Sequence, residues 1–159
     1  MEFVIRPFAA SDKDWLVDQH IRHYGPEDGF DATFGPFIAD IVDLFLAKTS
    51  GTGRAGWLAQ HGTERLGTIF CDRKSETCAQ LRLFYVVPRA RGAGVAQALI
   101  DTCVSFAKAE GYQEMVLWTL ASKAAAGGIY ARNGFVMVAE KSRQDFGAKF
   151  IEQTWQIAL

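Results

Sequence analysis

The spacing of apolar residues changes repeatedly along the chain, and each change predicts a new helix or strand. Apolar and polar residues alternate over residues 3–6, as in a short strand, and a helix is predicted over residues 12–24. Turn-forming residues fill 25–29, where we expect the chain to break. A second amphipathic helix should follow, because apolar residues recur there at helical spacing: Phe34, Phe37, Ile38, Ile41, Val42, Phe45 and Leu46.

The remaining elements are shorter and are separated by clear turn signals. A flexible segment is expected at 49–53, and a hairpin should form from strands 55–60 and 65–71 around the turn at 61–64. The later elements are a strand at 79–87, a helix at 94–110, a strand at 115–120, a helix at 122–132 and strands at 135–139 and 150–158. The predicted order is therefore β, α, α, β, β, β, α, β, α, β, β. No repeat or linker interrupts it, so we expect one domain over residues 1–159 with a shared core.

The helix between strands 79–87 and 115–120 has a consequence for the sheet. Two strands joined by a helix should run parallel through a right-handed crossover, although most of the other connections favour antiparallel pairs. Ligands prefer the carboxyl ends of such parallel strands. A site is therefore expected just beyond residue 87.

Charge and composition narrow the function. The chain of 159 residues is 49% hydrophobic and has 17 basic and 18 acidic residues, which give a formal net charge of −1. No broad positive field is available for nucleic acid or an anionic membrane, so neither is expected as a partner. No apolar run approaches the roughly 20 residues that span a bilayer, and no signal peptide is recognisable. Three cysteines without metal-ligand spacing are typical of a reducing compartment, and a cytoplasmic location is expected.

The strongest chemical signal is a glycine-rich turn between strand 79–87 and helix 94–110. Gly92 and Gly94 allow the backbone to approach a ligand closely, and the first N–H groups of the helix point toward the same place. The turn lacks the Lys-Ser/Thr ending of a P-loop and the third glycine of a dinucleotide fingerprint. It therefore predicts a phosphate cradle that is suited to neither ATP nor NAD.

In its context this turn resembles the central motif of the GNAT acetyltransferases, in which a strand ending in V-x-P leads into R-G-x-G-x-G/A. The matching positions are Val86, Pro88, Arg91, Gly92, Gly94 and Ala96. A second family signature, Y-x-x-x-G-F, is matched by residues 130–135 in the expected place. Residues 117–119 and 153–155 also look like the acetyltransferase half of bacterial MarR-GNAT fusion proteins, although the chain has no room for their DNA-binding half.

The resemblance implies a fold and a cofactor. The fold would be α/β (α+β), a mixed and mostly antiparallel sheet of about seven strands flanked by helices and splayed between strands 4 and 5. Acetyl-CoA would bind at the splay, with its pantetheine paired to the backbone of Val86. Its pyrophosphate would be held by the main-chain N–H groups of Arg91, Gly92, Ala93, Gly94, Val95 and Ala96. The 3′-phosphate of the cofactor has three candidate partners in Arg89, Lys123 and Arg132.

The resemblance also implies catalytic roles. Tyr130 would be the general acid that protonates the departing thiolate, because a phenol with a pKa near ~10 is protonated at neutral pH. Glu27, in the break between the first two helices, is our first candidate for holding or deprotonating the acceptor amine. Many family members have an asparagine after the fifth strand, whose side chain can reach the cofactor, and a glutamate before the cradle that acts as general base. Here Ser122 is the candidate substitute for the asparagine, and the base must come from elsewhere or be a water.

Alternative interpretations remain open at this stage. The chain is expected to be an N-acetyltransferase for a small-molecule or peptide amine, but a non-catalytic acyl-CoA-binding regulatory module and a DNA-binding regulator are alternatives. His20 and His23 share a helix face without a third ligand, so no metal is expected. Family habit and the apolar alternation of residues 150–158 favour a homodimer.

Overall fold

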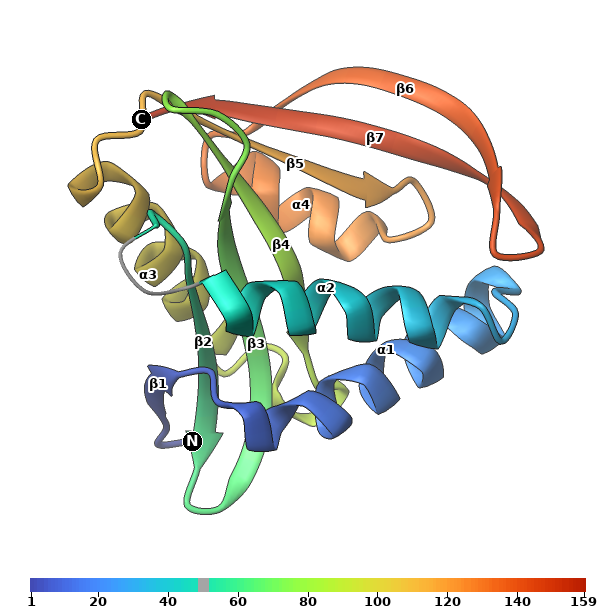
Figure 1. Cartoon of the computed structure of the whole chain (residues 1–159), viewed down its shortest axis with the longest axis horizontal. Helices are drawn as coiled ribbons and strands as arrows, with labels where there is room; N and C mark the ends of the chain where they lie inside the picture. The colour runs from blue at the N-terminus through green and yellow to red at the C-terminus, as the bar shows by residue number, and fades with distance from the viewer. Residues whose placement is uncertain (49–51) are drawn as a thin grey trace. The chain divides into compact units, whose positions relative to one another are not determined.

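The computed structural model describes residues 1–48 and 52–159, and its element order is the predicted one (Figure 1). Most of the segment predicted to be flexible, residues 49–51, lies outside the described residues. The strands are β1 (Val4–Pro7), β2 (Ala55–His61), β3 (Glu64–Arg73), β4 (Cys78–Val86), β5 (Glu114–Leu120), β6 (Val136–Asp145) and β7 (Ala148–Ala158). The helices are α1 (Lys13–Asp28), α2 (Phe34–Lys48), α3 (Val95–Ala109) and α4 (Ala124–Arg132), with 3₁₀ turns η1 (Ala10–Asp12) and η2 (Pro88–Ala90).

The strands form one seven-stranded sheet in the order β1-β2-β3-β4-β5-β7-β6. The ladders from β1 to β4 and the β6–β7 hairpin are antiparallel, whereas β4 and β5 are parallel with Cys78 opposite Glu114. The predicted fold class, a mixed and mostly antiparallel sheet flanked by helices, is confirmed.

The chain divides into two compact units. Unit 1 comprises Met1–Phe8, Thr49–Leu117 and Ile157–Leu159, and unit 2 comprises Ala9–Lys48 and Trp118–Gln156. The two units are described separately below. That residues 1–159 form a single domain stays a prediction.

The core of unit 1 lies between α3 and the central strands. Residues 66–71 of β3 are all buried, and the apolar face of α3 packs against them through Val95, Leu99 and Cys103. Phe106 meets Trp57 of β2 edge to face, with ring centroids 5.3 Å apart. The helical period that predicted α3 therefore also identified the face that it buries.

A bulge on β4 marks the end of its pairing with β5. The β4–β5 ladder covers Cys78–Gln80 in the described residues, and beyond it Leu83 has a φ of 49°. The register against β3 shifts at the same place, where the Thr68 hydroxyl donates a 2.8 Å hydrogen bond to the carbonyl of Leu83. A bulge bends the strand that carries it. The end of β4 is thus set by its pairing with β3 rather than with β5.

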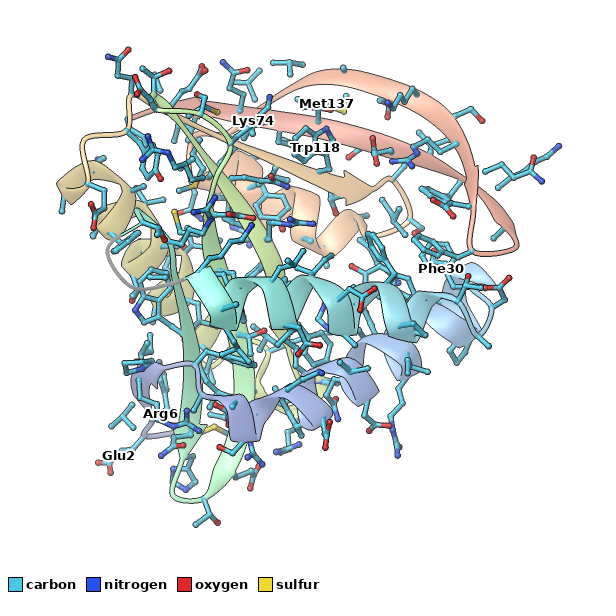
Figure 2. All side chains as sticks on the ribbon, viewed as in Figure 1. Glu2, Arg6, Phe30, Lys74, Trp118 and Met137 are labelled. Carbon is cyan, nitrogen blue, oxygen red and sulfur yellow. The ribbon has the colours of Figure 1, made fainter. Side chains whose placement is uncertain are left out.

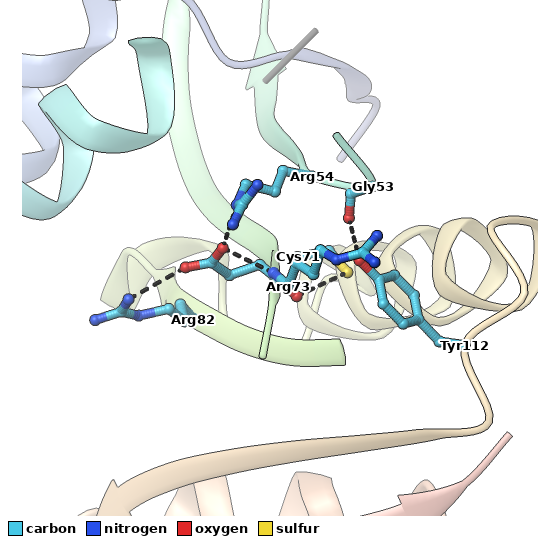
Figure 3. Close-up of polar contacts among 7 residues, drawn as sticks. Gly53, Arg54, Cys71, Arg73, Arg82 and Tyr112 are labelled. Atoms are coloured by element: carbon cyan, nitrogen blue, oxygen red, sulfur yellow. Dashed lines mark hydrogen bonds and ion pairs between the residues drawn. The ribbon is translucent and has the colours of Figure 1, made fainter. Parts of the chain in front are cut away.

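A polar cluster in unit 1 joins the start of β2 to β3, β4 and the α3–β5 connection (Figure 3). Asp72 accepts hydrogen bonds from Arg54 at 2.7 Å and Arg82 at 3.2 Å, as well as one from the backbone of Arg73. Burial would raise the pKa of Asp72, but these donors outweigh it and hold that pKa below its usual value. The Tyr112 hydroxyl donates to the Gly53 carbonyl at 2.7 Å. These contacts anchor the start of β2 to β3 and to the α3–β5 connection.

In unit 2, α1 continues through the break predicted at 25–29. The helix ends at Asp28, and Gly29 adopts a left-handed φ of 70° while its N–H bonds the Gly25 carbonyl at 3.0 Å. This is the usual glycine stop, and Pro26 removes only one helical hydrogen bond near the end. The predicted break was wrong in its position, because the turn composition belongs to the last turn of the helix. Glu27 and Asp28 are therefore helical.

The β6–β7 hairpin is also longer than predicted. The polar residues 140–145 extend β6 well beyond residue 139, and every residue of β6 is exposed. Arg143 on β6 forms a 2.8 Å ion pair with Glu152 on β7. Charged residues that pair across a hairpin look like loop residues in a pattern of apolar positions, which explains the short prediction.

Candidate functional site

The glycine-rich turn lies between β4 and α3 in unit 1, as the sequence predicts. Strand β4 ends at Val86, η2 follows, and the chain reaches α3 through Gly92 and Gly94, whose φ angles are 79° and 85°. A Cβ atom at either glycine would meet nothing within 4 Å. The glycines are required for the left-handed conformation, and the surface that they present is open.

The backbone N–H groups of this turn fall into two sets. Arg91 donates to Pro88 at 3.2 Å and Ala93 donates to Ala90 at 3.3 Å, so these two amides already have partners. Among the described residues, no protein acceptor satisfies the remaining four amides, which belong to Gly92, Gly94, Val95 and Ala96. In the first turn of α3, the N–H of Ala98 donates to the Gly94 carbonyl at 3.0 Å. Open N–H groups at the positive end of a helix dipole form an anion site.

The surroundings of the turn modify the expectations for its neighbours. Val86 is buried and pairs with Gly67, where a Cβ atom would lie 2.5 Å from the Tyr85 carbonyl oxygen. Arg89 forms an ion pair with Glu64, so this candidate for the 3′-phosphate is already engaged. Strand β4 has no carboxylate between Leu81 and Val86. Strand β4 therefore supplies no carboxylate that could act as a general base.

Tyr130 lies in unit 2, on the buried face of α4. Its side chain is 4% exposed, and its ring packs against those of Phe135 and Trp155 at centroid distances of 5.8 and 6.2 Å. Gly134 has a φ of 91°, and the N–H of Phe135 bonds the Tyr130 carbonyl at 3.0 Å. The glycine thus turns the chain so that the phenylalanine ring contacts the tyrosine ring. This is a local physical reason for the Y-x-x-x-G-F spacing.

Glu27 and Ser122 are brought together in unit 2 by Lys123 and Asp28. The Lys123 side chain is 8% exposed, and its Nζ lies 2.6 Å from Glu27 Oε2 and 2.8 Å from Asp28 Oδ2. The Asp28 contact is one of charge only, because the geometry forms no hydrogen bond to Oδ2. Ser122 Oγ donates to the other Asp28 oxygen at 2.6 Å. Lys123 is therefore buried against acids and does not fit the 3′-phosphate role considered from sequence.

An aromatic ring completes the surroundings of this lysine. Nζ of Lys123 lies 4.7 Å from the centroid of the Tyr24 ring, within the range of a cation–π contact. Burial first, and then the charges of Asp28 and Glu27, raise the pKa of Tyr24 to about 12. The hydrogen bond from Lys123, reinforced by its charge, lowers the pKa of the exposed Glu27. Glu27 is thus a carboxylate at neutral pH, better suited to holding a cation than to removing a proton.

The histidines of α1 have structural surroundings. His20 is buried, and its Nδ1 lies 3.0 Å from the carbonyl oxygen of Leu16, which can only accept. His23 packs edge to face on Tyr24 at 5.1 Å. Over residues 1–48 and 52–159, no group of three or more potential metal ligands is present. In the same residues, none of the helices combines the length and apolarity needed to cross a membrane.

Comparison with known proteins agrees with the motifs. The model of the acetyltransferase (GNAT) family matches residues 14–135. The chain is 30% identical to N-acetyltransferase 8B of Rattus norvegicus over 123 residues, which cover 74% of this chain and 52% of that protein. It is 31% identical to N-acetylaspartate synthetase of Danio rerio over 102 residues, which cover 64% of this chain and 36% of that protein. The chain thus spans about half the length of the N-acetyltransferase that it matches.

Solved structures share the fold at low sequence identity. An acetyltransferase of the GNAT family from Staphylococcus aureus Mu50 superimposes with a TM-score of 0.81 at 19% identity, covering 99% of both chains. Ard1 from Thermoplasma volcanium gives a TM-score of 0.78 at 21% identity and covers 100% of this chain and 99% of its own. At these identities the superpositions support the fold alone.

Proposed function

Because the chain belongs to the acetyltransferase (GNAT) family, a family of acyltransferases, we propose that it transfers an acetyl group from acetyl-CoA to a primary amine. The acceptor is a small molecule or a peptide amine. The observation that supports this most directly is the open set of four amides at the start of α3. Two phosphates joined by one oxygen need several donors at close range, and this turn offers them without a competing side chain.

In this proposal acetyl-CoA, the acetyl donor, is held mainly by backbone groups. The amides of Gly92, Gly94, Val95 and Ala96 bind the pyrophosphate, whereas the amides of Arg91 and Ala93 shape the turn through their bonds to η2. Val86 is the strand position that pairs with the pantetheine and polarises the thioester carbonyl. No metal takes part in this proposal.

The reaction is a direct attack in a ternary complex. The neutral amine nitrogen forms a bond to the thioester carbonyl carbon, the carbon–sulfur bond breaks, and the Tyr130 hydroxyl donates its proton to the leaving thiolate. The nitrogen loses its extra proton to water, since β4 supplies no carboxylate and the pKa of Glu27 is lowered. Glu27 instead holds the acceptor as an ammonium before it loses its first proton. Ser122 supports this region by bonding Asp28.

A charge placed at the cradle tests the donor site. We expect Gly94→Asp to abolish calorimetric binding of CoA, because its carboxylate occupies and repels the position of the pyrophosphate. Gly111→Asp is the matched control: Gly111 has a φ of 86°, also faces open space, and lies just beyond the other end of α3. It carries the same backbone strain without approaching the cradle. Equal CoA affinity in two folded variants would refute the site.

One observation favours a second candidate, a non-catalytic acyl-CoA-binding module: the absence of an acid on the strand before the cradle. The two candidates separate when CoA-thiol release is followed with a panel of amines, because the module binds acetyl-CoA without amine-dependent release. The likeness to MarR-GNAT fusion proteins adds only a DNA-binding alternative, which an electrophoretic shift at low salt would reveal. A cytoplasmic location and a homodimer belong to the proposal as well.

A further inference from the structure

A phenylalanine occupies a backbone position that local turn chemistry disfavours. Asp145 pairs with Ala148, so Phe146 and Gly147 form a two-residue hairpin turn between β6 and β7 in unit 2. Their φ angles are 52° and 71°, and turns with two positive φ values prefer Asn-Gly. Phe146 is one of two non-glycine residues with a positive φ in the described chain. A strained residue of this kind points to a use for its side chain.

The Phe146 ring packs into the connection between α1 and α2. Its centroid lies 5.0 Å from each of the rings of Phe30, Phe34 and Phe37. The backbone joins the same two segments, because the N–H of Asp31 donates to the Phe146 carbonyl at 2.8 Å. Figure 2 shows Phe30 where the start of α2 meets the β6–β7 turn. The hairpin tip is thus fixed to the loop that precedes α2.

The rings around this junction form a continuous aromatic surface. Phe30 contacts Phe150 at 5.2 Å and Tyr24 at 5.9 Å, in addition to Phe34 and Phe146. We call this set the aromatic wall: Tyr24, Phe30, Phe34, Phe37, Phe146 and Phe150. Phe34 is buried, but Phe37 is 44% exposed and Phe30, Phe146 and Phe150 are half-buried. The wall therefore still presents apolar area at the surface.

Negative charge borders the aromatic wall. Glu27 is 60% exposed and Asp31 is exposed, whereas the buried Lys123 is already held by Glu27 and Asp28. Two carboxylates thus face the ammonium of Lys123, and the exposed Asp31 adds a third negative charge in the connection between α1 and α2. Tyr24 links the charges to the rings, because Lys123 lies over its face and Phe30 stacks on it. A ligand with one positive charge and an apolar body complements this surface in both respects.

We propose that the aromatic wall binds the apolar part of the acceptor, so that the substrate is a primary amine on an aromatic-sized apolar group, with Phe146 as the residue that selects it. The inference rests on the proposed acetyl transfer and specifies its substrate class. A polyamine fits less well, because its several charges need more carboxylates than this surface exposes and its chain has no large apolar group to cover the rings. In the free protein, the packing of the Phe146 ring offsets the strain of its turn. The same ring contacts the apolar part of the acceptor when it binds.

Amine selectivity tests this proposal. The wild type should use phenethylamine with a higher kcat/KM than ethylamine or spermidine, and Phe146→Asn should lower the phenethylamine-to-ethylamine ratio at least tenfold. Asparagine suits the left-handed turn, so the hairpin should still form, which thermal melting checks. Phe146→Tyr keeps the ring and should keep the ratio. An unchanged ratio in folded Phe146→Asn, or a wild-type preference for spermidine, would overturn the proposal.

Direct binding separates this inference from the proposed function. If CoA binds but no amine is acetylated, the proposed function fails. Calorimetry with phenethylamine still measures the affinity of the aromatic wall for this amine. Saturable binding that is lost in Phe146→Asn and kept in Phe146→Tyr supports the aromatic wall as an amine site. Absence of phenethylamine binding to the wild type, with CoA present in place of acetyl-CoA so that no reaction occurs, refutes it.

Discussion

Lowering the pH from about 7.5 to about 5 should destabilise the protein through His20. This residue lies on the buried face of α1 with its side chain 3% exposed, and its Nδ1–H donates to the Leu16 carbonyl at 3.0 Å. Burial lowers the pKa of His20 to about 4, although the hydrogen bond to Leu16 opposes this shift and the charge of His23 adds to it. The folded protein therefore holds a neutral imidazole at a pH where the unfolded chain already binds a proton.

The sign and size of the effect follow from the pKa of His20 in the folded protein and in the unfolded chain. Histidine in an unfolded chain has a pKa near ~6.5, so the stabilising contribution is complete above that pH and is lost as the pH falls toward about 4. At about pH 5 this difference should lower the free energy of unfolding by roughly 2 kcal/mol relative to its value at neutral pH. Carboxylates with lowered pKa values, such as Asp72 and Glu27, contribute little in this interval, because their unfolded values lie near ~4.

Urea unfolding at both pH values measures this contribution when the wild type is compared with His20→Asn. Asparagine places an N–H near the position of Nδ1 and does not titrate, so it keeps a donor for Leu16. The wild type should lose about 2 kcal/mol more unfolding free energy between the two pH values than the variant does. Equal losses would show that His20 is not protonated preferentially on unfolding, and the reasoning from its burial would be refuted.

Three further outcomes are expected. Tyr130→Phe should lower kcat by roughly 10²-fold while acetyl-CoA affinity survives, and the basic limb of the pH–rate profile should weaken; full activity across that range would exclude Tyr130 as the acid. Glu27→Gln should chiefly raise the acceptor KM in steady-state assays, and a change confined to kcat would argue against its role in holding the amine. Sedimentation should detect a homodimer, whereas monomer alone at high micromolar concentration would remove that proposal.

The aromatic wall and the pyrophosphate cradle differ in how far the sequence reveals them. The cradle is local: two glycines, a preceding strand and a following helix lie within a dozen residues, so their spacing alone indicates the turn and its open amides. The order of all helices and strands was also predictable, because apolar periodicity reports which face of each element is buried. Even so, the sequence did not show that the amides of Arg91 and Ala93 donate hydrogen bonds within the turn.

Other features required the structure because they join distant parts of the chain. Lys123 is about a hundred residues from Glu27 and Asp28, and its burial between their carboxylates has no signal in a periodic pattern. The long β6 was missed for a related reason, since its charged residues are stabilised by partners on β7. The end of α1 depends on Gly29 adopting a left-handed conformation rather than on the proline before it.

The sequence by itself therefore determined the order of the elements, the sheet class and the glycine-rich turn, because each depends on residues that are neighbours along the chain. Only the tertiary structure decided which charges and rings meet at the end of α1. Coulomb energies and ring packing act over a few ångströms in space and do not depend on separation in sequence. Phe146 shows the difference most clearly: its strained turn contradicts local preference, and the rings of Phe30, Phe34 and Phe37 that it contacts lie on segments more than a hundred residues away.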